Sequence, residues 1–220
     1  MNWKKYWDRK AENEDLHLQV GRISKGASIR EQEFVTTVSH LVALLQLDKE
    51  DHLLDVCCGN GMLGSQLANY CMTVTGVDQS EELIKIAVKN FQSDTHRFFV
   101  QQADKLYFKN AQLFDKILLH FSFQYFNYLK GREVIRQMLK VAKPGAIIVI
   151  SDIPDAAKFN IYCKTFKSQV KYHLRQLLGI NIMGKFWKRE ELEKICAELG
   201  VKGEFLEQPS PLPYAWYRFD

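Results

Sequence analysis

An acid followed by a glycine-rich turn stands in the stretch LLDVCCGNG at residues 53–61. The apolar residues predict a buried strand that runs through the acid and a turn of small residues into a helix. Glycine lets a backbone approach a ligand closely because it has no Cβ, and a helix that follows aims its free N–H groups at that ligand. Open α/β sheets bind ligands at the carboxyl ends of their strands, where this turn would lie. The stretch therefore predicts a ligand site.

A second acid, Asp78, ends the sequence GVD at residues 76–78. It follows the glycine turn by about 20 residues, a spacing at which a carboxylate can accept hydrogen bonds from both ribose hydroxyls. Residues 59–64, GNGMLG, also form a literal GxGxxG, which suits an NAD-binding domain. In dinucleotide folds, however, the first glycine usually comes at the strand end, whereas here Asp55 and three further residues precede it.

The stretch at 53–61 resembles motif I of the class I S-adenosylmethionine-dependent methyltransferases. Further segments resemble this family in order and spacing over about residues 34–220: GVD at 76–78, QAD at 102–104, FDKILL at 114–119, LKVAKPGA at 139–146 and WKREEL at 187–192. The resemblance implies a doubly wound α/β fold of the Rossmann-like type and S-adenosylmethionine as the cofactor. It divides the chain into an N-terminal lid or lead (1–33) and a cofactor-binding domain (34–220) with a basic helical insertion at 156–186.

The resemblance also implies cofactor contacts. Asp55, Cys57, Gly59 and Gly61 would meet the methionine end, and Asp78 the ribose. The remaining expected contacts, including those at the adenine, are Asn60, Gln79, Ala103, Asp104 and Leu119. Cys57 stands where the family has its first glycine, which is a departure by one small residue. The family motif Asn/Asp-Pro-Pro-Tyr, typical of amide and nucleobase amino methylation, is replaced by HFSF at 120–123, so adenine-N6 chemistry is disfavoured.

Side chains outside these motifs are also candidates for the site. His120, at the expected end of the fourth strand, is a candidate general base because the ordinary pKa of histidine is near neutral; it could equally line the cofactor wall or pack in the core. Arg22 could hold the cofactor carboxylate with a bidentate fork. Trp3, Tyr6 and Trp7 could cover a sulfonium cation with their aromatic faces. The alternative for this N-terminal lead is an ordinary surface segment.

Alternating apolar runs and helical patterns place these residues on a parallel sheet with helices on both faces. We expect seven strands, the last two antiparallel, at 52–57, 73–77, 97–101, 114–121, 146–151, 203–207 and 215–220. Helices are expected at 31–46, 61–69, 80–91, 132–141, 157–178 and 188–199. Ser80 is the expected N-cap of the third of these, and Gly200 ends the last.

The segment from Ala156 to Arg189 contains eight Lys and Arg but no Asp or Glu. On a helix over 157–178 the apolar residues form one face: Phe159, Tyr162, Phe166, Val170, Leu174 and Leu177. The basic residues form another: Lys164, Lys167, Lys171 and Arg175. Such a helix suits an anionic substrate, a carrier protein or a membrane surface. The alternative is a solvated face above a core stripe.

The bulk composition is that of a globular domain. The chain has 220 residues, of which 46% are hydrophobic and 25% charged, and a net charge of +4. It has neither a signal-peptide core nor a run of roughly 18 apolar residues, so a cytoplasmic protein is expected. The five cysteines include no CxxC pair, which favours neither a disulfide framework nor a zinc site.

The sequence thus predicts methyl transfer from S-adenosylmethionine to an oxygen or nitrogen atom of a small, anionic metabolite. No recognised nucleic-acid-binding module is present, so nucleic acid ranks below such a metabolite as the substrate. Two alternatives stay open: a catalytically silent cofactor-binding or scaffold protein, and an NAD-dependent oxidoreductase.

Overall fold

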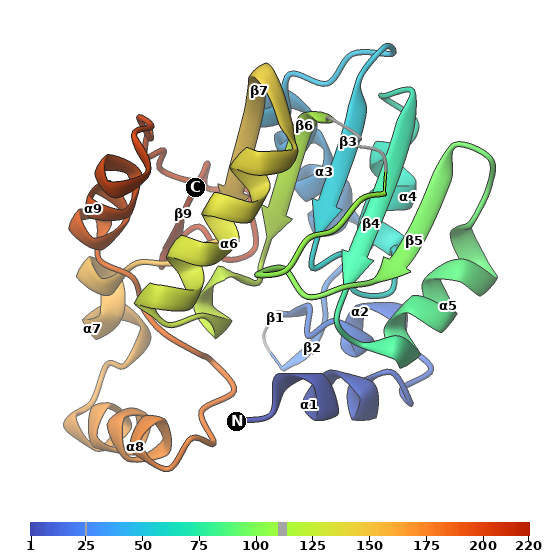
Figure 1. Ribbon diagram of the computed structural model, residues 1–220. Coiled ribbons are helices and arrows are strands. Elements are labelled where there is room, and N and C mark those ends of the chain that lie inside the picture. The colour runs from blue at the N-terminus through green and yellow to red at the C-terminus, as the bar shows by residue number, and fades with distance from the viewer. Residues whose placement is uncertain (25, 110–113) are drawn as a thin grey trace.

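Five parallel strands form the centre of the molecule in the computed structural model, which describes residues 1–24, 26–109 and 114–220 (Figure 1). Their order across the sheet is β5-β4-β3-β6-β7. The strands are β3 (His52–Val56), β4 (Thr73–Asp78), β5 (His96–Val100), β6 (Phe114–His120) and β7 (Ala142–Ser151). The chain moves outward from β3 to β5 and then returns to β6 beside β3, so the strand order reverses between β3 and β6. Ligands of open α/β sheets bind at such a reversal.

Helices cover both faces of this sheet, as the sequence predicts. On one face lie α3 (Glu31–Leu45) and α4 (Met62–Leu67), and α5 (Glu81–Phe91) packs beside β4 and β5. On the other lie α6 (Tyr128–Val141) and α9 (Arg189–Leu199). Neighbouring residues of β3 serve different cores: Leu53 packs with α3 and α4, whereas Leu54 packs with α6 and α9. This alternation follows from the two-residue period of a strand.

The residues that were expected to begin and to end two of the helices are confirmed. The Ser80 hydroxyl accepts a hydrogen bond from the Leu83 N–H at 3.2 Å and caps α5. Gly200 ends α9 with a left-handed φ of +70°. The helix expected at 132–141 begins earlier, at Tyr128, because the Asn127 side chain caps it. The fifth strand likewise begins at Ala142 rather than at residue 146.

The expected final antiparallel pair is present in a shorter form, so the expected count of seven strands in one sheet is wrong. The described residues form a five-stranded parallel sheet, and β8 (Ile153–Pro154) pairs antiparallel with β9 (Arg218–Phe219) in a separate sheet. Leu206 and Asp220 also exchange two backbone hydrogen bonds, at 2.8 and 2.9 Å. The intervening Pro209, Pro211 and Pro213 lack the N–H that a longer ladder needs.

The single long helix expected over 157–178 is also wrong. The segment consists of a 3-10 turn (Ala156–Lys158), α7 (Phe159–Tyr162) and α8 (Phe166–Leu177). Thr165 restarts the helix: its hydroxyl accepts from the Ser168 N–H at 3.2 Å, and its own N–H donates to the Ser168 hydroxyl at 3.1 Å. This reciprocal capping competes with a continuous helix.

The N-terminal segment lies across the carboxyl ends of the strands, below the arrowheads in Figure 1. It contains α1 (Trp3–Lys10), α2 (Leu16–Gln19) and the hairpin of β1 (Ile23–Ser24) and β2 (Ala27–Ser28). Asp8 of α1 accepts a hydrogen bond from the Ser80 hydroxyl at 2.7 Å, which ties α1 to the start of α5. Among the helices of the described ranges, none has the length and apolarity to cross a membrane.

Candidate functional site

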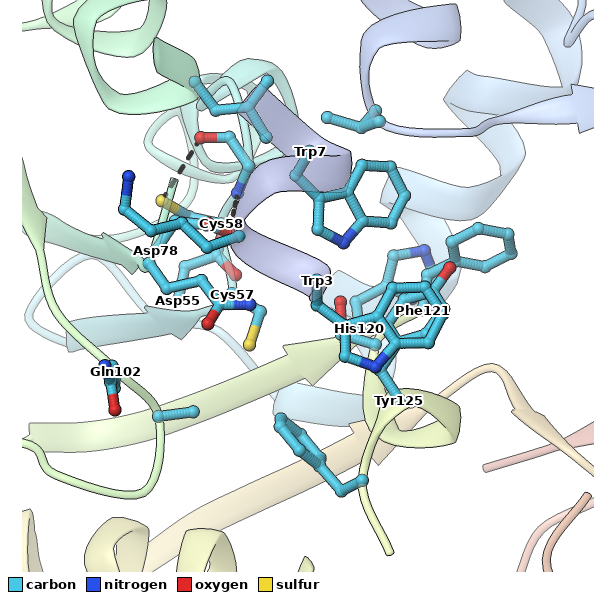
Figure 2. A pocket seen from close by; sticks show the side chains of 18 of the residues that line it. Trp3, Trp7, Asp55, Cys57, Cys58, Asp78, Gln102, His120, Phe121 and Tyr125 are labelled. Carbon is cyan, nitrogen blue, oxygen red and sulfur yellow. Dashed lines mark hydrogen bonds between the residues drawn. The ribbon is translucent and has the colours of Figure 1, made fainter. Parts of the chain in front are cut away.

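A cavity of about 440 Å³ opens at the carboxyl ends of β3, β4 and β6, underneath α1. Figure 2 shows Trp3 and Trp7 on one side of it and Asp55, Cys57 and Asp78 on another. Nine of the residues predicted to contact the cofactor or act as the base line this cavity, besides Trp3 and Trp7: Arg22, Asp55, Cys57, Gly59, Asp78, Gln79, Ala103, Asp104 and His120. The fold therefore brings together residues from five separate parts of the chain.

Three predicted contacts do not line the cavity. Asn60 is buried, and its amide donates to the Leu16 carbonyl at 2.8 Å and to the Gln19 side chain at 2.9 Å, so it anchors α2. Gly61 directly precedes α4 as its N-cap, with a φ of +77°. Leu119 is fully buried in the core beneath α6. These three residues therefore belong to the structure that surrounds the cavity.

The turn between β3 and α4 requires left-handed backbone at several positions. Gly59 has a φ of +57°, and a Cβ there would lie 2.7 Å from a methyl group of Val20. Cys57, where the resembling family has glycine, has a φ of +63°. Burial raises the pKa of its thiol well above the ordinary value, so the thiol stays protonated. A non-glycine residue in this region carries a cost of about 1–2 kcal/mol.

Replacing Cys57 with glycine is therefore expected to raise the free energy of unfolding by roughly 0.5–1 kcal/mol, after the greater backbone entropy of glycine in the unfolded chain is subtracted. Urea denaturation measures the change. Cys57→Ala is the matched control, since it removes the sulfur and keeps the Cβ. A glycine variant less stable than the alanine variant would contradict the assignment of strain to this backbone.

Asp78 is held by the backbone on both sides. Its Oδ2 accepts from the Gly59 N–H at 3.0 Å and its Oδ1 from the Ser80 N–H at 2.9 Å. Burial raises the pKa of Asp78, and these N–H groups oppose that rise. Each oxygen retains a lone pair, so the fixed carboxylate can accept two more hydrogen bonds, as a pair of vicinal hydroxyls would offer.

Asp55 and Arg22 are opposite charges buried without full hydrogen bonding. Asp55 is 2% exposed and Arg22 8%. Neither Asp55 Oδ2 nor Arg22 Nη1 has a hydrogen-bond partner among the described residues. Burial raises the pKa of Asp55 to about 7, against the attraction of Arg22, and burial lowers the pKa of Arg22 to about 10. Unpaired buried polar atoms are costly, so both side chains are suited to a zwitterionic ligand that carries an ammonium and a carboxylate.

His120 lies at the end of β6, facing the cavity. Burial, with a contribution from the charge of Arg22, lowers the pKa of His120 to about 3, which keeps the imidazole neutral. Its Nδ1 lies 2.8 Å from the Ser151 hydroxyl, which orients the ring. The other wall is aromatic: the Tyr125 ring centroid lies 4.3 Å from that of Trp3 and 5.6 Å from that of Trp7.

Several lining residues were not expected from the sequence. Lys130 of α6 forms an ion pair with Asp104 Oδ2 at 3.4 Å, while the buried Asp104 Oδ1 has no partner among the residues that the structure describes. Phe121 lines the cavity with a φ of +57°. Gln102 and Cys58 could have been found, since each adjoins a matched motif residue. Nothing in the sequence around Lys130 indicates its position, because only the packing of α6 brings it to the cavity.

Comparisons with known proteins agree with this geometry. The profile of a family described as a methyltransferase domain matches residues 53–145. The ubiquinone biosynthesis O-methyltransferase of Caulobacter vibrioides is 27% identical over 97% of this chain and 83% of its own length. That of Coxiella burnetii is 32% identical over 52% of this chain, and the match spans about half, 48%, of its length. The N-methyltransferase NodS of Bradyrhizobium japonicum, solved with S-adenosyl-L-homocysteine, superposes with a TM-score of 0.63 at 17% identity, over 97% of this chain and 94% of NodS.

Proposed function

We propose that this chain is a class I S-adenosylmethionine-dependent methyltransferase and that it transfers a methyl group from S-adenosylmethionine to an oxygen or nitrogen atom of a small molecule. The cofactor, when bound, supplies an electrophilic methyl group on a sulfonium. The observation that carries the proposal is that Asp55 and Arg22 line the same cavity and that each has a buried side-chain atom without a hydrogen-bond partner among the described residues. An α-amino acid offers an ammonium to the carboxylate of Asp55 and a carboxylate to the guanidinium of Arg22.

The other lining residues fit the remaining parts of the cofactor. Asp78 presents a fixed carboxylate to the ribose hydroxyls. Asp104 Oδ1, buried and unpartnered within the described ranges, can accept a hydrogen bond from the adenine amino group. Gln79 and Ala103, each next in sequence to one of these acids, also line the cavity and would meet the adenine. A cavity of about 440 Å³ is within the usual size range of ligand sites.

The aromatic wall and His120 would serve the transfer step. Faces of Trp3, Trp7 and Tyr125 attract a sulfonium cation and exclude water from it. Methyl transfer depends largely on holding the acceptor in line with the methyl group. A neutral His120 can accept a hydrogen bond from an acceptor hydroxyl or amine, and its pKa of about 3 favours orienting the acceptor over removing its proton. The name of the Caulobacter relative supports oxygen as the methylated atom.

Calorimetric titration with S-adenosylmethionine, S-adenosylhomocysteine and NAD tests the cofactor. We expect micromolar binding of the first two, lost in Asp78→Ala and retained in Asp94→Ala, which removes an exposed acid. Release of S-adenosylhomocysteine in the presence of a panel of phenols, amines and carboxylates tests the transfer. Binding of NAD alone would overturn the proposal in favour of an oxidoreductase, and cofactor binding without turnover on any acceptor would favour a silent binding protein.

A further inference from the structure

The apolar side of α8 faces outward. Five residues form this side, four within the helix and Leu178 directly after it, and are here called the α8 outer face: Phe166, Val170, Leu174, Leu177 and Leu178. All are exposed, with Phe166 at 81% and Leu177 at 84%. The sequence suggested a core stripe through four of them, but each of the five side chains is at least 40% exposed. Figure 1 shows α8 set apart from the central sheet, at the lower left. Contiguous exposed apolar surface on a globular protein usually marks a site of interaction.

The inward side of α8 packs the Tyr172 ring against Phe159 and Phe186 and is held by specific hydrogen bonds. The Tyr172 hydroxyl donates to the Gly184 carbonyl at 2.8 Å. The Gln169 amide donates to the Cys163 carbonyl at 3.1 Å, and the Asn181 amide donates to the Gln176 side chain at 3.0 Å. These bonds fix the rotation of the helix about its axis, so the exposure of the outer face is a property of the fold.

A row of positive charge borders the outer face. Lys167, Lys171 and Arg175 follow each other at helical spacing, and all three are exposed. None of them forms an ion pair within the described ranges, and the chain has no acid between Ala156 and Arg189. An apolar face beside an unneutralised basic row is typical of helices that lie in the plane of an anionic membrane surface.

We propose that the α8 outer face docks on the surface of a bilayer that contains anionic lipids. The large aliphatic and aromatic side chains would enter the boundary between headgroups and acyl chains, while the basic row meets the lipid phosphates. Twelve residues give a helix about 18 Å long, enough to lie along the interface. Charge complementarity favours this occupant over a second copy of the chain, whose α8 would bring the same positive charge.

The position of α8 connects this surface to the cavity. The apolar surface continues beyond the helix through Ile180 and Ile182, each 54% exposed. A Cβ on Gly179, between helix and Ile180, would lie 3.4 Å from the backbone nitrogen of Met1, and Met1 lines the cavity. A docked bilayer would therefore lie beside the N-terminal rim of the cavity. The docking itself does not depend on methyl transfer.

Flotation with lipid vesicles tests the proposal on the full chain. We expect the protein to float with vesicles of equal parts phosphatidylglycerol and phosphatidylcholine, and the floating fraction to decrease as the salt concentration rises. With vesicles of phosphatidylcholine alone, the protein should not float. Phe166→Ser/Leu177→Ser should weaken the partition at least roughly tenfold. The matched control Tyr107→Ser/Leu129→Ser removes an aromatic and a leucine that are 72% and 66% exposed elsewhere, and should leave the partition unchanged.

A second pair of variants tests the charge. Lys167→Gln/Lys171→Gln should lower the partition roughly tenfold, whereas Lys89→Gln/Lys140→Gln, on exposed positions of α5 and α6, should not. Retained binding of S-adenosylhomocysteine would show that each variant is folded. The proposal fails if the protein does not bind anionic vesicles or if the α8 variants float with them to the same extent as the wild type. It also fails if sedimentation without lipid shows a dimer that the α8 variants dissociate, since the face would then join two copies.

Discussion

Asp55→Asn is expected to stabilise the ligand-free protein at pH 8 and to abolish most of its affinity for S-adenosylmethionine. The pKa of Asp55 is raised to about 7 in the folded chain, chiefly by burial, whereas in the unfolded chain it is about 3.9. The folded protein thus binds this proton more tightly, so the free energy of unfolding falls as pH rises from about 4 to about 7. The difference of about three between the two pKa values corresponds to roughly 4 kcal/mol, and the attraction of Arg22 is already included in the folded-state pKa.

Urea denaturation between about pH 4 and pH 8 measures this effect. The difference between Asp55→Asn and wild type should be near zero at the acid end and should grow until pH 8. The dissociation constant for S-adenosylmethionine should rise roughly a hundredfold, because an ammonium would meet a neutral amide in a buried site. Asp94→Asn, on an exposed acid, should change neither quantity. Parallel stability curves for variant and wild type would refute the raised pKa.

Gly184→Ala is expected to lower the free energy of unfolding by roughly 3 kcal/mol or more. Gly184 has a φ of +75°, and a Cβ there would overlap the carbonyl oxygen of Gln124. The obstacle is backbone, so no side-chain rotation relieves it. The same Gln124 carbonyl accepts from the Lys185 N–H at 2.8 Å, and Gln124 precedes Tyr125 of the cavity wall. The substitution should therefore also weaken cofactor binding.

Gly200→Ala separates the clash from the backbone strain. Gly200 has a similar φ of +70°, but a Cβ there would meet nothing within 4 Å. Its replacement should cost only about 1 kcal/mol. Thermal denaturation of both variants measures the difference. Equal losses of stability would mean that the segment around Gly184 moves away from Gln124 without cost.

The sequence predicted the parts of the site that depend on neighbours along the chain. The β3–α4 turn, Asp78 at the end of β4 and the Ser80 cap follow from residue type and short spacing, and the structure places all of them as expected. The rotation of α8 could not be predicted in this way. Its apolar stripe is evident from the period of the helix, but the side that faces the protein is set by Tyr172 and Gly184, which meet only in the folded chain.

Electrostatic interactions between residues far apart in the chain could not be predicted from the sequence either. His120 was expected near its ordinary pKa, whereas burial beside Arg22, nearly a hundred positions away in the chain, makes it a much weaker base. The ion pair of Lys130 with Asp104 has the same origin, because α6 must pack before the two groups meet. Spacing alone carries no information about such pairs.

The hydrogen bond from the Gly59 N–H to Asp78 Oδ2 links the turn after β3 to the carboxylate at the end of β4. The proposed site for the amino-acid end of the cofactor and the proposed site for its ribose are therefore connected. In the proposed cofactor complex, adenosine would engage Asp78 and thereby order the same turn whose backbone is proposed to receive the amino-acid end of the cofactor. Binding of the two halves is then a pair of coupled equilibria, in which each half raises the affinity for the other by the same factor. Adenosine and methionine supplied as separate fragments should accordingly bind cooperatively, and a nucleoside that cannot reach Asp78 should lose this cooperativity together with its own contact.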